Sequence, residues 1–144
     1  MLHPSRALVT ILLLSLAGLS ACSKDAAVPA TVFTPEQMLV GHWQLTASTN
    51  GMTGRTSPAD PTQRLELIFT SAGQWTTLLN GTVVQTGPYS LIKRQSMLTK
   101  QLETYLVTAP GTSQLSQTVR VDATTLVLGF DAYDGPSETY QRQR

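Results

Sequence analysis

Few side chains in this sequence could carry out chemistry, and they do not form a recognisable catalytic set. The chain has two histidines, His3 and His42, and one cysteine, Cys22. A zinc site needs three or four ligands, and nucleophilic catalysis needs a nucleophile with a base and an orienting acid. Neither set is evident around His42, and no Gly-x-Ser-x-Gly motif is present. We therefore predict that the protein is not an enzyme and that it holds no metal or cofactor.

The acidic residues near the C-terminus are a second set with chemical potential. Asp131, Asp134 and Glu138 lie close together in the sequence and carry the oxygen atoms that calcium prefers as ligands. Their spacing does not match an EF-hand loop, and aspartate beside Gly and Pro is common in turns. We interpret both aspartates as turn residues, with a calcium loop as the alternative.

The cysteine follows an apolar stretch that has the layout of a secretory signal. Arg6 supplies positive charge ahead of an almost wholly aliphatic run over residues 7–16, and small residues precede Cys22. This run is too short and wrongly flanked for a membrane span. The ending Leu19-Ser20-Ala21-Cys22 resembles the lipobox of bacterial lipoproteins, in which the signal is cut before the cysteine and the thiol is acylated. We predict a signal peptide over residues 1–21 and a lipid attached to Cys22.

This resemblance implies a membrane-anchored protein of the bacterial cell envelope. With a single cysteine, no intramolecular disulfide can form, so lipid attachment explains the thiol better than disulfide bonding does. Two or more acyl chains hold a protein firmly to a membrane, whereas one chain binds only marginally. By the sorting rule of enteric bacteria, Ser23 after the cysteine favours the outer membrane.

The charge balance argues against a nucleic-acid partner. The chain has 10 Lys and Arg residues and 9 Asp and Glu residues, a formal net charge of +1. Removing Arg6 with the signal leaves the remainder neutral, so there is no basic surface of the kind that binds phosphate backbones. The remaining length suits one domain with a single core.

The segment after the cysteine reads as a tether that leads into a short helix. Residues 23–32 are small, polar and alanine-rich, which is typical of a flexible linker, and we place the lipidated cysteine and tether at residues 22–33. Thr34 can cap a helix, Pro35 suits its first position, and Gln37 completes a capping box. Gly41 ends the helix after a turn or two. We place the folded domain at residues 34–144.

From Gly41 onward, apolar residues recur at every second position, as in half-buried strands. Asn80-Gly81 between two apolar pairs is a strong hairpin signal, and Gly87-Pro88 predicts a break. Residues 97–108 fit both a helix and a strand, and we favour a strand because strands flank them. A loop is predicted over 50–62 and a turn over 109–111. The predicted strands are 41–48, 65–69, 75–79, 82–86, 89–93, 97–108, 115–121, 124–130 and 137–142.

Short strands joined by tight turns predict an all-β antiparallel meander, either an up-and-down barrel or a sandwich. Gly41-His42-Trp43 after a short capped helix is similar to the Gly-x-Trp start of lipocalins. The order of the later motifs, from Leu65-Glu66-Leu67-Ile68-Phe69 to Tyr140-Gln141-Arg142, also agrees. Residues 34–142 resemble the lipocalin-like domains common in small lipoproteins of Bacteroidetes-type bacteria. The resemblance implies a small up-and-down barrel of about eight strands.

The resemblance also implies how one end of the barrel is closed. In lipocalins the Trp of this motif closes one end, and a basic residue near the final strand packs over its ring. Here that places Trp43 beneath Arg142, with the first and last strands adjacent and Gly41 letting the chain run close beneath the ring. The alternative is that Arg142 is a solvated residue of the C-terminal tail, like Arg144.

Two functions follow from this fold. The first is binding of a small apolar molecule inside the barrel, because eight strands leave an interior that is either filled or holds one such ligand. The residues that could line such a site are Leu65, Leu67, Phe69, Trp75 and Tyr89. The second is a protein-interaction module of the envelope with a packed interior, working through an outer face or the 50–62 loop. The bulk of Trp43 and of the lining residues favours the second function, and the resemblance favours the first.

Overall fold

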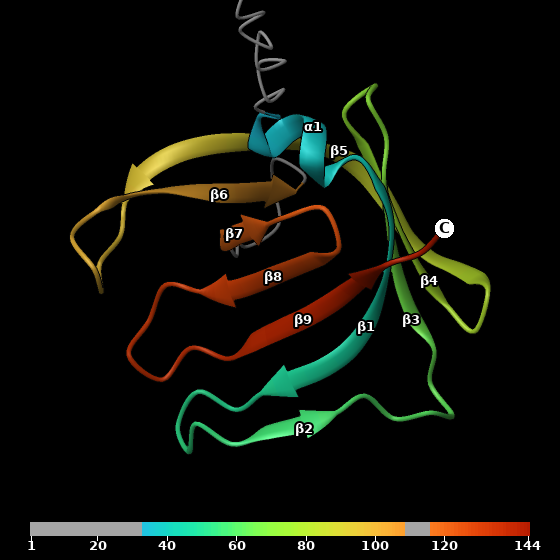
Figure 1. Ribbon diagram of the computed structural model, residues 1–144, viewed down its shortest axis with the longest axis horizontal. Coiled ribbons are helices and arrows are strands. Elements are labelled where there is room, and N and C mark those ends of the chain that lie inside the picture. Colours follow the sequence, from blue (N-terminus) through green and yellow to red (C-terminus); the bar gives the residue numbers. More distant parts are fainter. Residues whose placement is uncertain (1–32, 109–115) are drawn as a thin grey trace, which may run out of the picture. The chain divides into compact units, whose positions relative to one another are not determined.

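A computed structural model describes residues 33–108 and 116–144, which form a closed antiparallel β-barrel with one short helix (Figure 1). The helix α1 spans Pro35–Leu39. The strands in these residues are β1 (Gly41–Thr49), β2 (Thr56–Pro58), β3 (Leu65–Phe69), β4 (Gln74–Leu79), β5 (Thr82–Gln95), β6 (Leu102–Thr108), β7 (Gln117–Val121), β8 (Thr125–Phe130) and β9 (Ser137–Arg142). The predicted signal peptide, Cys22, most of the tether and the 109–111 turn lie outside the described residues.

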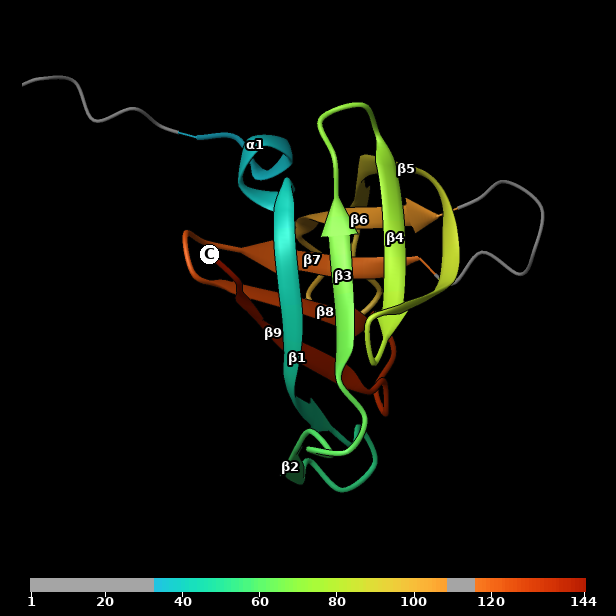
Figure 2. The ribbon, with the colours of Figure 1, turned by 90° about the vertical axis from the view of Figure 1, so that its right-hand side faces the viewer.

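The barrel closes because the last strand pairs with the first. The strands follow the order β1-β3-β4-β5-β6-β7-β8-β9, and β9 pairs back to β1 with Trp43 opposite Arg142. The ninth strand, β2, pairs only with the end of β1 and stands outside the closed ring. Figure 2 shows β1, β3 and β4 crossing in front of β6, β7 and β8. The predicted fold class, a small antiparallel up-and-down barrel of about eight strands, is confirmed.

The start of the domain forms as its capping signals predict. The Thr34 hydroxyl accepts from the Gln37 backbone N–H at 3.4 Å, and the Gln37 side chain accepts from the Thr34 N–H at 3.0 Å. This reciprocal capping box satisfies two donors at the start of α1. The helix lies at the end of the barrel where β1 begins (Figure 2).

The hairpin between β4 and β5 also follows from its residues. Asn80 has a φ of 52° and Gly81 a φ of 78°, the left-handed conformations that a tight hairpin turn requires. The Asn80 side chain further accepts from the Arg64 backbone N–H at 2.8 Å. The turn is therefore tied to the start of β3.

The predicted break at Gly87-Pro88 is wrong, because β5 runs continuously from Thr82 to Gln95. Residues 82–88 of β5 pair with β4, and residues 89–95 pair with β6. The two residues lie where the strand changes its partner. Proline has no backbone N–H to donate, and β5 pairs with only one neighbour at a time here, so Pro88 fits without ending the strand. The Gly-Pro pair marks a change of partner rather than an end.

Two other boundaries differ from the predictions. The 50–62 segment includes β2, which pairs with the end of β1. The predicted strand over 97–108 forms only from Leu102, because the preceding residues make the β5–β6 turn. In that turn the Ser96 hydroxyl accepts from the backbone N–H groups of Leu98 and Thr99 at 3.1 Å, and this local bonding competes with strand pairing.

The core consists of inward side chains from nearly every strand of the ring. These buried residues are Leu39, Trp43, Leu67, Phe69, Trp75, Leu106, Val119, Leu126, Leu128 and Tyr140. They alternate with outward residues, as a strand period of two requires. Leu39 of α1 belongs to the same cluster, so the helix covers one end of the core.

Candidate ligand-binding cavity

A cavity of about 210 Å³ remains inside the barrel, between the walls formed by β3–β4 and by β6–β9. Its lining residues are Leu65, Leu67, Phe69, Trp75, Thr77, Leu106, Thr108, Gln117, Leu128, Glu138 and Tyr140. The deep part of this wall is buried and largely apolar. The half-exposed lining residues, Leu65, Thr77, Thr108, Gln117 and Glu138, mark the side that opens toward solvent.

Four of the five residues predicted as lining belong to this wall, and Tyr89 does not. The Tyr89 ring instead packs edge-on against Phe69, with ring centroids 5.1 Å apart. Its hydroxyl donates to the Thr70 carbonyl at 3.0 Å, and burial together with the Glu36 charge of α1 raises its pKa. Tyr89 therefore helps to pack the barrel near the helix instead of lining the cavity.

The indole nitrogen of Trp75 is a buried donor without a hydrogen-bond partner among the described residues. The Trp75 side chain is 8% exposed and lines the cavity. Its Nε1 lies against Gly87 of β5, where a β-carbon would come within 3.4 Å. A buried donor left unpaired costs about 1–3 kcal/mol, so an acceptor atom at this position would be stabilising.

Glu138 and Tyr140 form a hydrogen-bonded polar pair in the wall of the cavity. The Tyr140 hydroxyl donates to Glu138 Oε2 at 2.6 Å. Burial, together with the neighbouring Glu138 carboxylate, raises the pKa of Tyr140. The hydroxyl therefore stays protonated and acts as a donor to the carboxylate.

Neither Glu138 nor Tyr140 was among the predicted lining residues. A signal was present, because side chains two apart on a strand share a face. Since Arg142 was predicted to point inward over Trp43, Tyr140 and Glu138 had to point inward as well.

The end of the barrel next to α1 is closed by Trp43 and Arg142. Arg142 Cζ lies 4.1 Å from the centre of the Trp43 ring, as the resemblance led us to expect. Arg142 donates from Nε to the Ala123 carbonyl at 2.8 Å, from Nη1 to the Val40 carbonyl at 2.9 Å, and from Nη2 to the Met38 carbonyl.

The same arrangement satisfies the carbonyl groups at the end of α1. Trp43 Nε1 donates to the Leu39 carbonyl at 2.8 Å, and Arg142 serves the carbonyls of Met38 and Val40. These groups have no partner within so short a helix. Gly41 has a φ of 149°, and a β-carbon there would collide with the Arg142 guanidinium. Gly41 was expected to let the chain run close beneath the Trp43 ring, but the close approach that it allows is to the Arg142 guanidinium.

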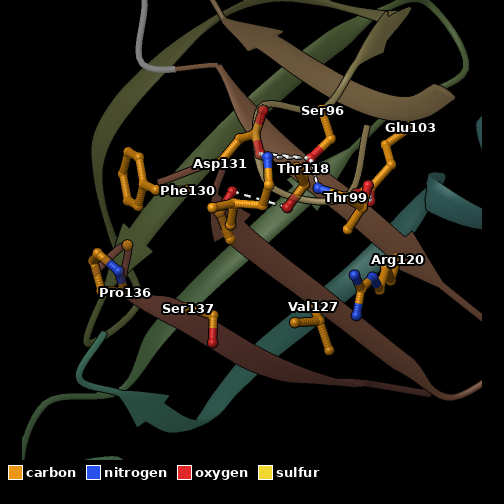
Figure 3. A pocket seen from close by; sticks show the side chains of 13 residues that line it. Ser96, Thr99, Glu103, Thr118, Arg120, Val127, Phe130, Asp131, Pro136 and Ser137 are labelled. Carbon is orange, nitrogen blue, oxygen red and sulfur yellow. Dashed lines mark hydrogen bonds between the residues drawn. The ribbon is translucent and has the colours of Figure 1, made fainter. Parts of the chain in front are cut away.

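Asp131 holds the β5–β6 turn against the outside of the barrel (Figure 3). Its carboxylate accepts from Ser96 Oγ and the Met97 N–H, both at 2.7 Å, and from the Tyr105 hydroxyl at 2.6 Å. The hydrogen bond from Tyr105 lowers the pKa of Asp131 most, and the bonds from the turn lower it further. A groove of about 180 Å³ lies beside this contact, on the outer face of β6–β9.

The acidic cluster does not converge on one point. Asp131 binds the turn, Glu138 faces the cavity, and Asp134 is exposed. In residues 33–108 and 116–144, no group of three or more His, Cys, Asp or Glu side chains is arranged to hold a metal ion.

His42 lies on the outer face of the barrel, as expected. Its Nε2 is 2.8 Å from Glu66 Oε1, and Arg64 Nη2 lies 2.8 Å from the same oxygen. Glu66 is 4% exposed, so these two neighbours cover its carboxylate. This cluster explains how an outward carboxylate can be buried.

No protein-family model, curated protein or solved structure matches this chain. None of the helical segments in the described part of the chain is long and apolar enough to cross a membrane.

Proposed function

We propose that this protein is a lipid-anchored, lipocalin-like binding protein of the bacterial envelope that holds one small, largely apolar molecule inside its barrel. The observation that carries the proposal is the cavity of about 210 Å³ within the barrel. This space lies between the side chains of both barrel walls and opens to solvent on one side, which supports ligand binding over the alternative of a protein-interaction module with a packed interior. The anchor rests on the Leu19-Ser20-Ala21-Cys22 motif, which precedes the described residues.

The size of the cavity limits the ligand. Drug-sized ligands occupy pockets of about 300–1,000 Å³, whereas benzene fills an apolar cavity of about 150 Å³. At about 210 Å³, the interior suits a molecule slightly larger than benzene. The unpartnered Trp75 Nε1 can donate to an acceptor atom or to the π face of an aromatic ligand.

A binding role agrees with the chemistry of the wall better than a catalytic one does. The cavity-lining residues in the described part of the chain include no histidine, cysteine or lysine. His42 lies on the outer face against Glu66. The wall therefore supplies apolar contact and hydrogen bonds rather than a nucleophile with its base.

The proposal is tested by titrating the folded domain with small aromatic molecules such as indole and 2-phenylethanol. Saturable binding should perturb the amide signals of residues around Leu67 and Trp75 in NMR spectra. It should also raise the melting temperature, because a ligand at 100 times its Kd stabilises by about 2.7 kcal/mol.

The Leu67→Trp variant fills the cavity and should abolish binding, whereas Val83→Trp, at a 57% exposed site, should retain it. If Leu67→Trp does not fold, Leu128→Phe gives the same test with a smaller added volume. Equal binding by a cavity-filling variant and by Val83→Trp would refute the proposal, as would the absence of saturable binding by the unaltered domain.

A further inference from the structure

We propose that the cavity selects amines, namely small apolar molecules with a protonated amino group, and that Glu138 is the residue that binds this group. This inference rests on the proposed function, since it names the ligand class of the same cavity. It follows from the charge of the wall, from the hydrogen bonding of Glu138 and from the position of Glu138 in the barrel.

Glu138 is the one Asp, Glu, Lys, Arg or His side chain among the described residues that line the cavity. The ion pairs found in the described residues join His42 and Arg64 to Glu66, on the outer face. No Lys, Arg or His nitrogen there lies within 4.0 Å of the Glu138 carboxylate. Residues 109–115, between β6 and β7, include no charged residue in the sequence. The carboxylate thus has no cation to balance it at the cavity.

The hydrogen bond from Tyr140 leaves room for a ligand on Glu138. A carboxylate offers about four acceptor positions, and the Tyr140 hydroxyl occupies one of them on Oε2. An ammonium group has three N–H donors and no acceptor, so it is complementary to the positions that remain. Tyr140 is 2% exposed, so its hydroxyl is held in place, and its hydrogen bond orients the Glu138 carboxylate.

The place of Glu138 in β9 sets the orientation of the ligand. Glu138 is opposite Leu128 of β8, which is 2% exposed and belongs to the apolar wall. Glu138 itself is half-exposed, on the open side of the cavity, whereas Tyr140 lies deeper along the same face of β9. An amine would enter with its apolar body toward Phe69 and Leu106 and leave its charged group at Glu138.

The wall also disfavours anions. A ligand carboxylate at this position would face Glu138 without a compensating cation, and like charges at close range repel strongly in a partly desolvated site. The aromatic groups of the wall add to the preference, because the faces of aromatic rings attract cations. Among ligands of one shape, we expect the order amine, then alcohol, then carboxylate.

The test compares 2-phenylethylamine, 2-phenylethanol and phenylacetate, which share one skeleton and differ in charge at pH 7. Calorimetry on the folded domain should show the amine binding about tenfold or more tightly than the alcohol, which is the scale of one charged hydrogen bond. Phenylacetate should bind more weakly than the alcohol. The preference for the amine should shrink at high salt.

Glu138→Gln should remove the difference between amine and alcohol while leaving alcohol binding in place. Glu103→Gln, which removes the same charge from the outer face of β6, should retain the preference. Glu138→Lys should reverse the order so that phenylacetate binds best, which keeps the test decisive if the Gln variant binds nothing because its fold is altered.

The outcomes separate the two proposals. If none of the three molecules binds the unaltered domain, the cavity is not a binding site for molecules of this size, and the proposed function fails. If all three bind with similar affinity, or if Glu138→Gln leaves the amine preference unchanged, the domain is a carrier and the assignment of amines to Glu138 is wrong.

Discussion

Arg142 is the residue whose loss should destabilise the barrel most clearly without touching the cavity. Its guanidinium stacks on the fully buried Trp43 ring and donates to carbonyl groups from α1 and from the β7–β8 turn. The variant Arg142→Ala removes the stacking and all of these hydrogen bonds in one step. It also leaves the end of α1 without partners for the carbonyls of Met38 and Val40.

The size of the effect can be worked from these contacts. A guanidinium over an aromatic face contributes about 0.5–2 kcal/mol, with the upper half expected where the ring is buried. Hydrogen bonds from a charged donor contribute about 1.5–3 kcal/mol each, but water will replace part of those at this end of the barrel. The contributions are not additive, and we expect a loss of about 2–4 kcal/mol in the free energy of unfolding. For a domain of this length, that lowers the melting temperature by about 8–16 °C.

Thermal and urea denaturation followed by circular dichroism measure this loss. Arg144→Ala is the matched control, because Arg144 is the neighbouring basic residue of the tail and is exposed. Arg142→Lys should fall between the two, since an ammonium keeps the charge but cannot reach carbonyls in three directions from a planar group. Equal small shifts for Arg142→Ala and Arg144→Ala would refute the assignment of Arg142 as the closing residue.

Three further predictions concern other parts of the chain. Gly41→Ala should lower the melting temperature strongly, and by much less in an Arg142→Ala background, because the added β-carbon collides with that guanidinium; equal losses in both backgrounds would contradict the clash. The hydrogen bonds to Asp131 hold its pKa below the ordinary value of 3.8, so its contribution to stability is present above about pH 4 and is lost as the pH falls further. Urea midpoints at pH 7 and pH 3 should therefore lie closer together in Asp131→Asn than in the unaltered protein or in the exposed control Asp134→Asn. When cells that express the protein are grown with an alkyne fatty acid, the native protein should be labelled and the Cys22→Ser variant should not. Absence of label on the native protein would refute the lipid-anchor hypothesis.

Much of the fold could be predicted from the sequence, because its signals are local. The alternation along residues 65–69 and 137–142 depends only on the strand period of two, and both ranges match β3 and β9. Asn80-Gly81 can adopt left-handed backbone conformations at low cost, so the hairpin position followed as well. The Trp43–Arg142 stacking was reached through the resemblance to lipocalins and through the adjacency of the first and last strands.

Contacts between distant segments were decided by the tertiary structure. Gly87-Pro88 has the composition of a break, yet it lies inside β5 because the strand passes from β4 to β6 at that point. Asp131 has the composition of a turn residue, yet its carboxylate binds the Met97 N–H, 34 positions away. No local pattern specifies either partner.

The candidate site also combines features that local sequence predicts with features that only the tertiary structure decides. Its apolar wall was predicted from alternation, but the remaining space of about 210 Å³ depends on how side chains from opposite walls meet. The strand period places Glu138 on the same face of β9 as Tyr140, but only barrel closure brings that face opposite the apolar side chains of β3 and β4. The period of a strand is set by neighbouring residues, whereas pairing, closure and the volume left inside are set by residues far apart in the chain.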